Sequence, residues 1–180
     1  MRSFVTTSRT VRGAHSRGAT ALAVLALALS AAPQAGAAPA VEVGATAPDF
    51  VLKATDGRNL RLAEYRGDVV VISFWASWCG GCEAALEALK GLPADPQGAT
   101  PVVLAISLDG DARRVASAAR SMDLGYPMLV DARQQVGRLY DVDALPYTLI
   151  LDRDGVVIGA WTDAPAPRAE IERLAAEARP

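Results

Sequence analysis

The sequence predicts an α/β fold, with a mixed central sheet, helices on both faces and an N-terminal β-hairpin. The segment Val69–Phe74 is an almost unbroken run of β-branched residues, which is typical of a strand buried on both faces of a sheet. Strand-like and helical segments alternate after it, and this order favours parallel strand neighbours. Asp56-Gly57 and Asp154-Gly155 lie between short apolar segments, and Asp-Gly is a strong hairpin signal.

The remaining elements follow from local patterns. Ala85, Leu86 and Leu89 share one helical face, Asp109-Gly110-Asp111 can cap a helix, and Pro167 is suited to a helix start. We therefore expect, in order, strands 49–52, 60–62 and 69–74, helix 82–90, strand 101–107, a capped helix ending near 122, an extended segment 126–130, helix 133–140, strands 148–151 and 156–161, and a C-terminal helix.

The pattern of residues 1–37 is typical of a secretory signal peptide. Residues 1–40 contain four arginines and no acidic residue, and the apolar run Ala19–Leu29 is followed by Ala35-Gly36-Ala37, an A-x-A cleavage pattern. An uncleaved membrane anchor is the alternative, although the run is shorter than the roughly 20 residues of a typical span. We therefore expect a signal peptide (1–37), a linker (38–47) and one domain (48–180), located in the periplasm or otherwise outside the cytoplasm.

Composition excludes several classes of function. The residues after position 40 hold 14 basic and 20 acidic side chains, and this acidic balance argues against nucleic acid as a partner. The single histidine, His15, lies in the predicted signal peptide, and the chain has only two cysteines. A four-ligand Cys/His zinc site cannot be assembled from these residues within one mature chain. Haem attachment through C-x-x-C-H fails because Glu83 stands at the histidine position. We expect no metal and no cofactor.

Residues 78–82 (WCGGC) contain both cysteines, at the point where the buried strand gives way to a helix. Cys79 is expected at the helix N-terminus, where free N–H groups and the helix dipole favour a thiolate. Cys82 would then lie on the inner face of the helix, within disulfide-bonding reach. The pattern predicts thiol–disulfide exchange, with Cys79 as nucleophile and Cys82 as the resolving thiol. A structural disulfide and half of an intermolecular metal site are the alternatives.

Four segments carry a resemblance to a known family. Residues 74–82 resemble the thioredoxin active site, and residues 43–50 resemble an opening segment shared with the peroxiredoxins. Residues 140–148 and 150–155 supply a second landmark. Over residues 41–177 the chain is similar to the TlpA/ResA-like branch of exported thioredoxin-fold thiol–disulfide oxidoreductases. The resemblance implies a thioredoxin fold with a central insertion that contains a helix.

The resemblance also assigns site residues. It implies that Pro146 is a cis-proline facing the Cys79–Cys82 disulfide, that Leu145 offers backbone hydrogen bonds to the bound substrate, and that Trp78 covers the active site. A cis bond before proline is accessible, since it lies only about 0.5–1 kcal/mol above trans.

Three positions depart from the family pattern. Gly81 replaces the proline that usually precedes the second cysteine, and Ser73 stands where thioredoxins have a buried aspartate. Ala85 occupies a position at which some reductases of the branch have a glutamate. Glu83 and Glu87 are nearby acids, but a solvated helix face explains both. The proton acceptor for Cys82 is therefore not assigned by the sequence.

The resemblance favours an exported monomeric reductase of specific protein disulfides, with clients such as apocytochrome c and a membrane-bound electron donor. A peroxiredoxin-like thiol peroxidase is one alternative, although residues 72–79 lack the Pro and Thr of the P-x-x-x-T-x-x-C pattern. A copper metallochaperone using the two thiols is another, and the absence of a mature histidine argues against it.

Overall fold

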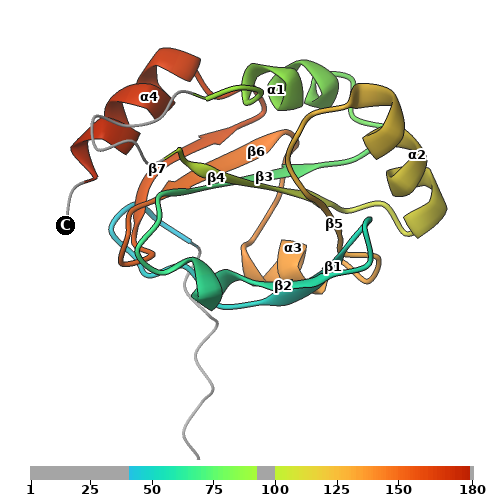
Figure 1. Cartoon of the computed structure of the whole chain (residues 1–180), viewed down its shortest axis with the longest axis horizontal. Coiled ribbons are helices and arrows are strands. Elements are labelled where there is room, and N and C mark those ends of the chain that lie inside the picture. Colours follow the sequence, from blue (N-terminus) through green and yellow to red (C-terminus); the bar gives the residue numbers. More distant parts are fainter. Residues whose placement is uncertain (1–40, 93–99, 179–180) are drawn as a thin grey trace, which may run out of the picture. The chain divides into compact units, whose positions relative to one another are not determined.

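The computed structural model describes residues 41–92 and 100–178. They form a seven-stranded mixed sheet with the strand order β2-β1-β5-β4-β3-β6-β7 (Figure 1). The predicted signal peptide, residues 1–37, lies outside the described residues. The strands are β1 (Val51–Ala54), β2 (Asn59–Arg61), β3 (Val70–Trp75), β4 (Val102–Ser107), β5 (Met128–Val130), β6 (Tyr147–Leu151) and β7 (Val157–Thr162). The predicted α/β class is confirmed.

β3 is the strand on which the sheet is built. It pairs in parallel with β4 and antiparallel with β6, and all six of its residues are buried. Val70 and Ile72 pack into the core on one face of the sheet, while Val71 packs into the core on the other. Burying each such side chain stabilises the fold by about 1.5–3 kcal/mol. The double-faced burial explains why this strand has no polar alternation in its sequence.

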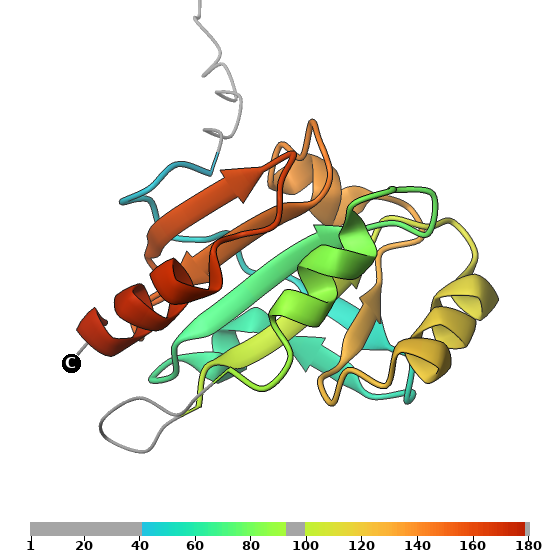
Figure 2. The same ribbon diagram turned by 90° about the horizontal axis from the view of Figure 1, so that it is seen from above.

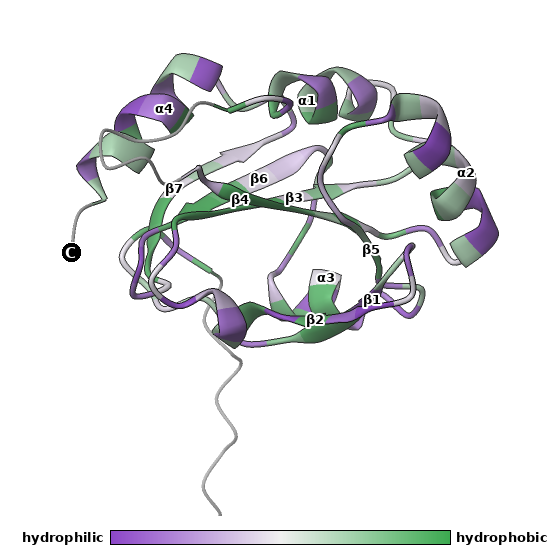
Figure 3. Ribbon diagram, in the orientation of Figure 1, coloured by the Kyte–Doolittle hydropathy of each residue, from purple (hydrophilic) through white to green (hydrophobic). Residues whose placement is uncertain are grey.

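Helices cover both faces of the sheet, as predicted. α1 (Cys82–Ala88), α2 (Ala112–Met122) and α4 (Arg168–Glu177) lie on one face, and α3 (Gln135–Leu139) lies on the other with the β1–β2 hairpin (Figures 1 and 2). A short 3-10 helix, Leu62–Tyr65, follows β2. Hydrophilic residues mark the outer parts of α2 and α4, while β4 and β5 are strongly hydrophobic (Figure 3).

The N-terminal hairpin is shifted relative to the prediction. Its strands occupy 51–54 and 59–61 rather than 49–52 and 60–62. The shift arises because the carboxylate of Asp49 accepts hydrogen bonds from the backbone N–H of Ala63 and from the guanidinium of Arg61. These bonds hold the start of the segment outside the strand ladder.

Part of the expected linker belongs to the domain. Val41 and Ala47 are buried, Gly44 donates a backbone hydrogen bond to Val157, and Ala47 donates one to Gly155. Residues 41–47 therefore pack against the start of β7, and the domain begins before residue 48. No helix within the described ranges is long and apolar enough to cross a membrane.

Helix α4 contacts the C-terminal end of α1. The guanidinium of Arg168 donates hydrogen bonds to the carbonyl oxygen of Ala88, the last residue of α1, and to those of Lys90 and Gly91 just beyond it. A cation at a helix C-terminus is favoured by the helix dipole, and it satisfies carbonyls that lack helical partners. Arg168 thereby connects α4 to α1.

Gly159 allows β7 to approach α4, and its replacement should be destabilising. A Cβ at this position would lie 2.7 Å from Trp161, 2.8 Å from Leu174 and 2.9 Å from Ile150. We expect Gly159→Ala to lower the free energy of unfolding by about 1–3 kcal/mol, measured by urea denaturation. The matched control is Gly110→Ala, since its Cβ would meet only a carbonyl oxygen at 3.9 Å. Equal denaturation midpoints for the two variants would contradict the prediction.

Candidate active site

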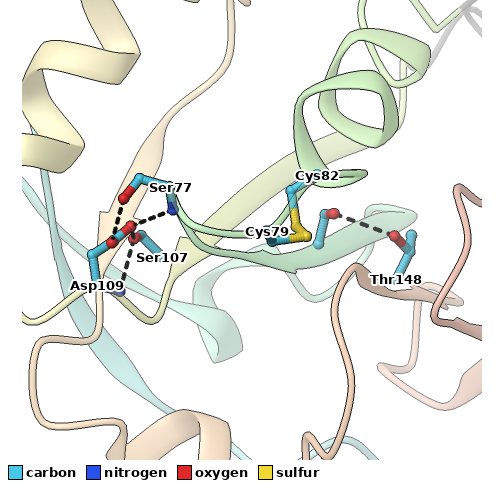
Figure 4. The surroundings of a disulfide bond; sticks show 7 residues. Ser77, Cys79, Cys82, Ser107, Asp109 and Thr148 are labelled. Atoms are coloured by element: carbon cyan, nitrogen blue, oxygen red, sulfur yellow. Dashed lines mark hydrogen bonds between the residues drawn. A yellow bond between two sulfur atoms is a disulfide. The ribbon is translucent and has the colours of Figure 1, made fainter.

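Cys79 and Cys82 form a disulfide at the end of the sheet next to β3 (Figure 4). Their sulfurs are 2.11 Å apart and their Cα atoms 5.5 Å apart. Cys79 is half-buried, whereas Cys82 is only 1% exposed. An attacking client sulfur can therefore approach Cys79 and not Cys82. This difference in access fits the predicted roles of nucleophile and resolving thiol.

The loop between β3 and α1 presents the disulfide. β3 ends at Trp75, the N–H of Cys79 bonds to the carbonyl of Ala76, and the N–H of Cys82 bonds to the carbonyl of Cys79. α1 begins only at Cys82. The prediction that Cys79 sits at the helix N-terminus is therefore wrong by one turn. The reason is that the chain first forms a tight turn after the strand, so the helix dipole acts on Cys79 from a greater distance than expected.

An open groove of about 680 Å³ borders Cys79. Trp78, Leu145 and Pro146 line it together with Cys79, so the structure brings all the predicted substrate-contacting residues to one place. The Leu145–Pro146 peptide bond is cis. A Cβ at Gly81 would lie 3.8 Å from Pro146 Cδ, which places this proline against the CxxC loop. Trp78 is 68% exposed and offers a flat apolar surface beside the disulfide.

The groove also contains residues that the sequence reasoning missed. Among the described residues that line it, the ionisable side chains besides the cysteine are the exposed carboxylates of Asp143 and Asp163, and Leu108 and Gln134 complete part of its wall. Asp143 lies three residues before Pro146 and could have been found from that proximity. Asp163 and Gln134 carry no such signal, because they come from loops distant in sequence.

Cys82 faces the hydrophobic core. It packs with Trp75, Leu86 and Val115 beneath α1. Trp75 is buried, and its indole N–H has no hydrogen-bond partner among the described residues. Glu83 and Glu87 are exposed on α1, whereas Ala85 is buried. The two acids therefore belong to the solvated helix face, as the sequence indicated.

Ser73 and Thr148 replace the buried acid of thioredoxins with a neutral pair. Both residues are fully buried, on neighbouring strands β3 and β6, and their hydroxyl oxygens are 3.2 Å apart (Figure 4). Each hydroxyl can donate to or accept from the other, so the pair is satisfied without a charge. The position offers no carboxylate that could take the proton of Cys82.

Comparisons with known proteins identify the family. The model of the AhpC/TSA family matches residues 43–160, which include the CxxC motif and Pro146. The chain belongs to the AhpC/TSA family. The thiol-disulfide oxidoreductase ResA of Geobacillus thermodenitrificans is 37% identical over 118 residues, covering 66% of this chain and 68% of that protein.

Solved structures agree with this identification. A protein assigned as the thiol:disulfide interchange protein DsbE from Chlorobium tepidum aligns with a TM-score of 0.65 and 28% identity over 75% of this chain and 94% of that one. The exposed lipoprotein thioredoxin of Streptococcus pneumoniae aligns with a TM-score of 0.63 and 27% identity over 72% and 99%. These matches confirm the thioredoxin fold and the ResA-like resemblance. Because its CxxC motif forms a disulfide and its relatives are thiol–disulfide oxidoreductases, the chain is a thiol–disulfide oxidoreductase of the ResA/DsbE type.

The neutrality of the Ser73–Thr148 pair can be tested with Ser73→Asp. Burial should raise the pKa of the introduced carboxyl above its unfolded value of about 3.9. The loss of folding free energy caused by the carboxyl is then small below the unfolded pKa, where both states are protonated. It grows as the pH rises from the unfolded pKa toward the folded pKa. We expect urea unfolding to show Ser73→Asp less stable than Ser73→Ala by about 1–3 kcal/mol at pH 7, and by much less at pH 4. The same difference at both pH values would contradict a dry, uncharged site.

Proposed function

We propose that the chain is an exported reductase of protein disulfides. Each turnover begins when the Cys79 thiolate attacks one sulfur of a client disulfide. The client S–S bond breaks, and the departing client thiolate takes a proton from water. Cys82, after losing its own proton, attacks Cys79 Sγ and releases the second client thiol. Two electrons pass to the client, and the protein is left with the Cys79–Cys82 disulfide seen in the structure.

The electrostatics of the groove carry the assignment of direction. A strong oxidant of this fold stabilises its reduced form, which requires groups that favour a thiolate. Here the described residues lining the groove include the carboxylates of Asp143 and Asp163 and neither lysine nor arginine. Negative neighbours disfavour a thiolate at Cys79 and so favour the disulfide form of the protein. A protein that is more stable as a disulfide gives its electrons to clients.

The open groove supports a protein client rather than a small molecule. It runs past the exposed Trp78 and the cis-proline loop, and a neighbouring hollow lined by Leu108, Gln134 and Val142 continues from it. An extended segment beside Leu145 can use backbone hydrogen bonds, as in other modes of peptide recognition. We propose exported proteins with paired cysteines as clients, apocytochrome c among them. The ResA and DsbE relatives support exchange with disulfides.

The cycle requires an electron source. Each client reduction consumes the dithiol, so a donor must break the Cys79–Cys82 disulfide again. We assign this step to a membrane-bound dithiol donor. We propose that the chain acts as a monomer, since the disulfide forms within one chain and the exchange needs no second copy.

The peroxidase alternative draws on the AhpC/TSA family match. Against it, Cys79 is already paired with Cys82, and Ile72 and Ala76 stand where the P-x-x-x-T-x-x-C pattern has its Pro and its Thr. Consumption of hydrogen peroxide by the reduced protein would decide in favour of this alternative.

Trapping with Cys82→Ser tests the exchange cycle. This variant can form the mixed disulfide through Cys79 and cannot resolve it. We expect covalent complexes with exported proteins in growing cells, which dissolve on treatment with dithiothreitol and are identified by mass spectrometry. Cys79→Ser is the control and should give none. Complexes that persist in Cys79→Ser, or none with Cys82→Ser, would contradict the assigned roles.

The redox state of the wild-type chain in growing cells tests the direction of electron flow. Rapid acid quenching and thiol alkylation should find the wild-type chain mostly as a dithiol if a donor keeps it reduced. A chain held mostly as a disulfide, with clients more oxidised than in its absence, would identify an oxidant instead.

Export predicts a defined N-terminus. If the signal is cleaved after Ala37, the chain isolated from cells should begin at Ala38. Intact-mass measurement after cell fractionation checks this, with the soluble extracytoplasmic fraction expected to hold the processed form. A chain that retains Met1 in the membrane fraction would support the uncleaved anchor, and one that retains Met1 in the cytosol would contradict export.

A further inference from the structure

Asp109 carries a set of contacts for which the exchange cycle gives no role. It lies two residues after the end of β4 and is only 4% exposed. The backbone N–H and the hydroxyl of Ser77 donate to its two carboxylate oxygens over 2.8 and 2.7 Å, and the hydroxyl of Ser107 donates over 2.9 Å (Figure 4). Two of the three donors belong to the loop that presents Cys79.

These contacts favour a carboxylate. An ionised carboxylate only accepts hydrogen bonds, and here both of its oxygens are used. An asparagine could keep the bonds of one oxygen and donate from its NH₂ group to the Ser77 hydroxyl, which can also accept, but it would carry no charge. Bonds to a charged acceptor are about twice as strong as bonds between neutral groups, so the site selects Asp over its amide.

The contacts act on an exposed part of the loop. Ser77 lies two residues after the end of β3 and two before Cys79, and it is exposed apart from its contact with Asp109. Cys82, by contrast, is held by the start of α1 and by the core around it. The distance between the two sulfurs therefore depends on how firmly the loop is attached to β4.

We propose that Asp109 is a positioning residue that holds Cys79 within reach of Cys82 through Ser77. In the closing step the Cys82 thiolate attacks Cys79 Sγ, the bond from Cys79 to the client sulfur breaks, and the client leaves as a thiolate that is protonated by water. Restricting the loop raises the effective concentration of one cysteine at the other. The inference rests on thiol–disulfide exchange at this pair and not on its direction.

The test is the equilibrium of the purified protein with glutathione redox buffers. Asp109→Asn should shift the equilibrium toward the dithiol by about tenfold, which corresponds to about 30 mV for this two-electron couple. Ser77→Ala keeps the carboxylate and the backbone donor but loses the hydroxyl, and it should shift the equilibrium in the same direction by about threefold. Ser77→Thr retains a hydroxyl and should restore the wild-type value.

The matched control is Asp131→Asn. Asp131 is 2% exposed, follows β5 at the same edge of the sheet, and accepts backbone hydrogen bonds from Gln135 and Gly137 of α3. Its burial is close to that of Asp109 and both of its carboxylate oxygens also accept hydrogen bonds, but its donors are backbone N–H groups outside the Cys79 loop. Its amide variant should lose stability in urea and leave the glutathione equilibrium within about twofold of wild type.

Three outcomes would overturn the proposal. The first is a shift in Asp131→Asn equal to that in Asp109→Asn, which would indicate a general loss of stability. The second is no shift in either Asp109→Asn or Ser77→Ala. The third is a shift in Asp109→Asn alone, accompanied by a Cys79 pH–rate profile moved to lower pH, because this would show an effect of charge rather than of position. If Asp109→Asn does not fold, the comparison of Ser77→Ala with Ser77→Thr still decides.

Discussion

The burial of β3 on both faces is the constraint on which the rest of the molecule depends. A strand that is dry along its whole length can carry no ionised side chain without a large penalty, so its one polar residue, Ser73, is neutral and paired with Thr148. Reactive groups are therefore found only where the strand stops. The disulfide, the cis-proline loop and the two buried carboxylates all lie at that edge or in the loops that leave it.

The two cysteines are held by different means, and their chemistry reflects this. Cys82 is fixed by packing, since α1 places it among Trp75, Leu86 and Val115. Cys79 is fixed by polar contacts, because the loop that carries it touches β4 through a carboxylate. Packing excludes water and clients from one sulfur, while hydrogen bonds leave the other half-exposed. The same edge of the sheet thus supplies a protected thiol and an accessible one.

Much of the fold could be predicted because its signals are local. The β-branched run of β3, the hairpin turns and the Asp111 cap each depend on residues next to one another. The CxxC motif is equally local, whereas the part assigned to Pro146 came from family resemblance, since spacing alone marks it as an ordinary loop proline. Contacts between distant segments were not predictable. The bond between Asp49 and Arg61 sets where the first hairpin begins, and Val41 packs in the core. Asp109 accepts from Ser77, 32 positions away in the sequence, and no periodic pattern predicts this contact.

The contact between Arg168 and the end of α1 has a consequence for the order in which the chain matures. The ribosome makes α1 well before α4, so the carbonyls of Ala88, Lys90 and Gly91 have no guanidinium partner until all seven strands of the sheet have been made. β6, which flanks β3, is also made after the cysteines. In a nascent chain both thiols are therefore exposed before the strands and helices that leave Cys79 accessible and bury Cys82 have been made. The contact between α4 and α1 therefore forms after both thiols have been made.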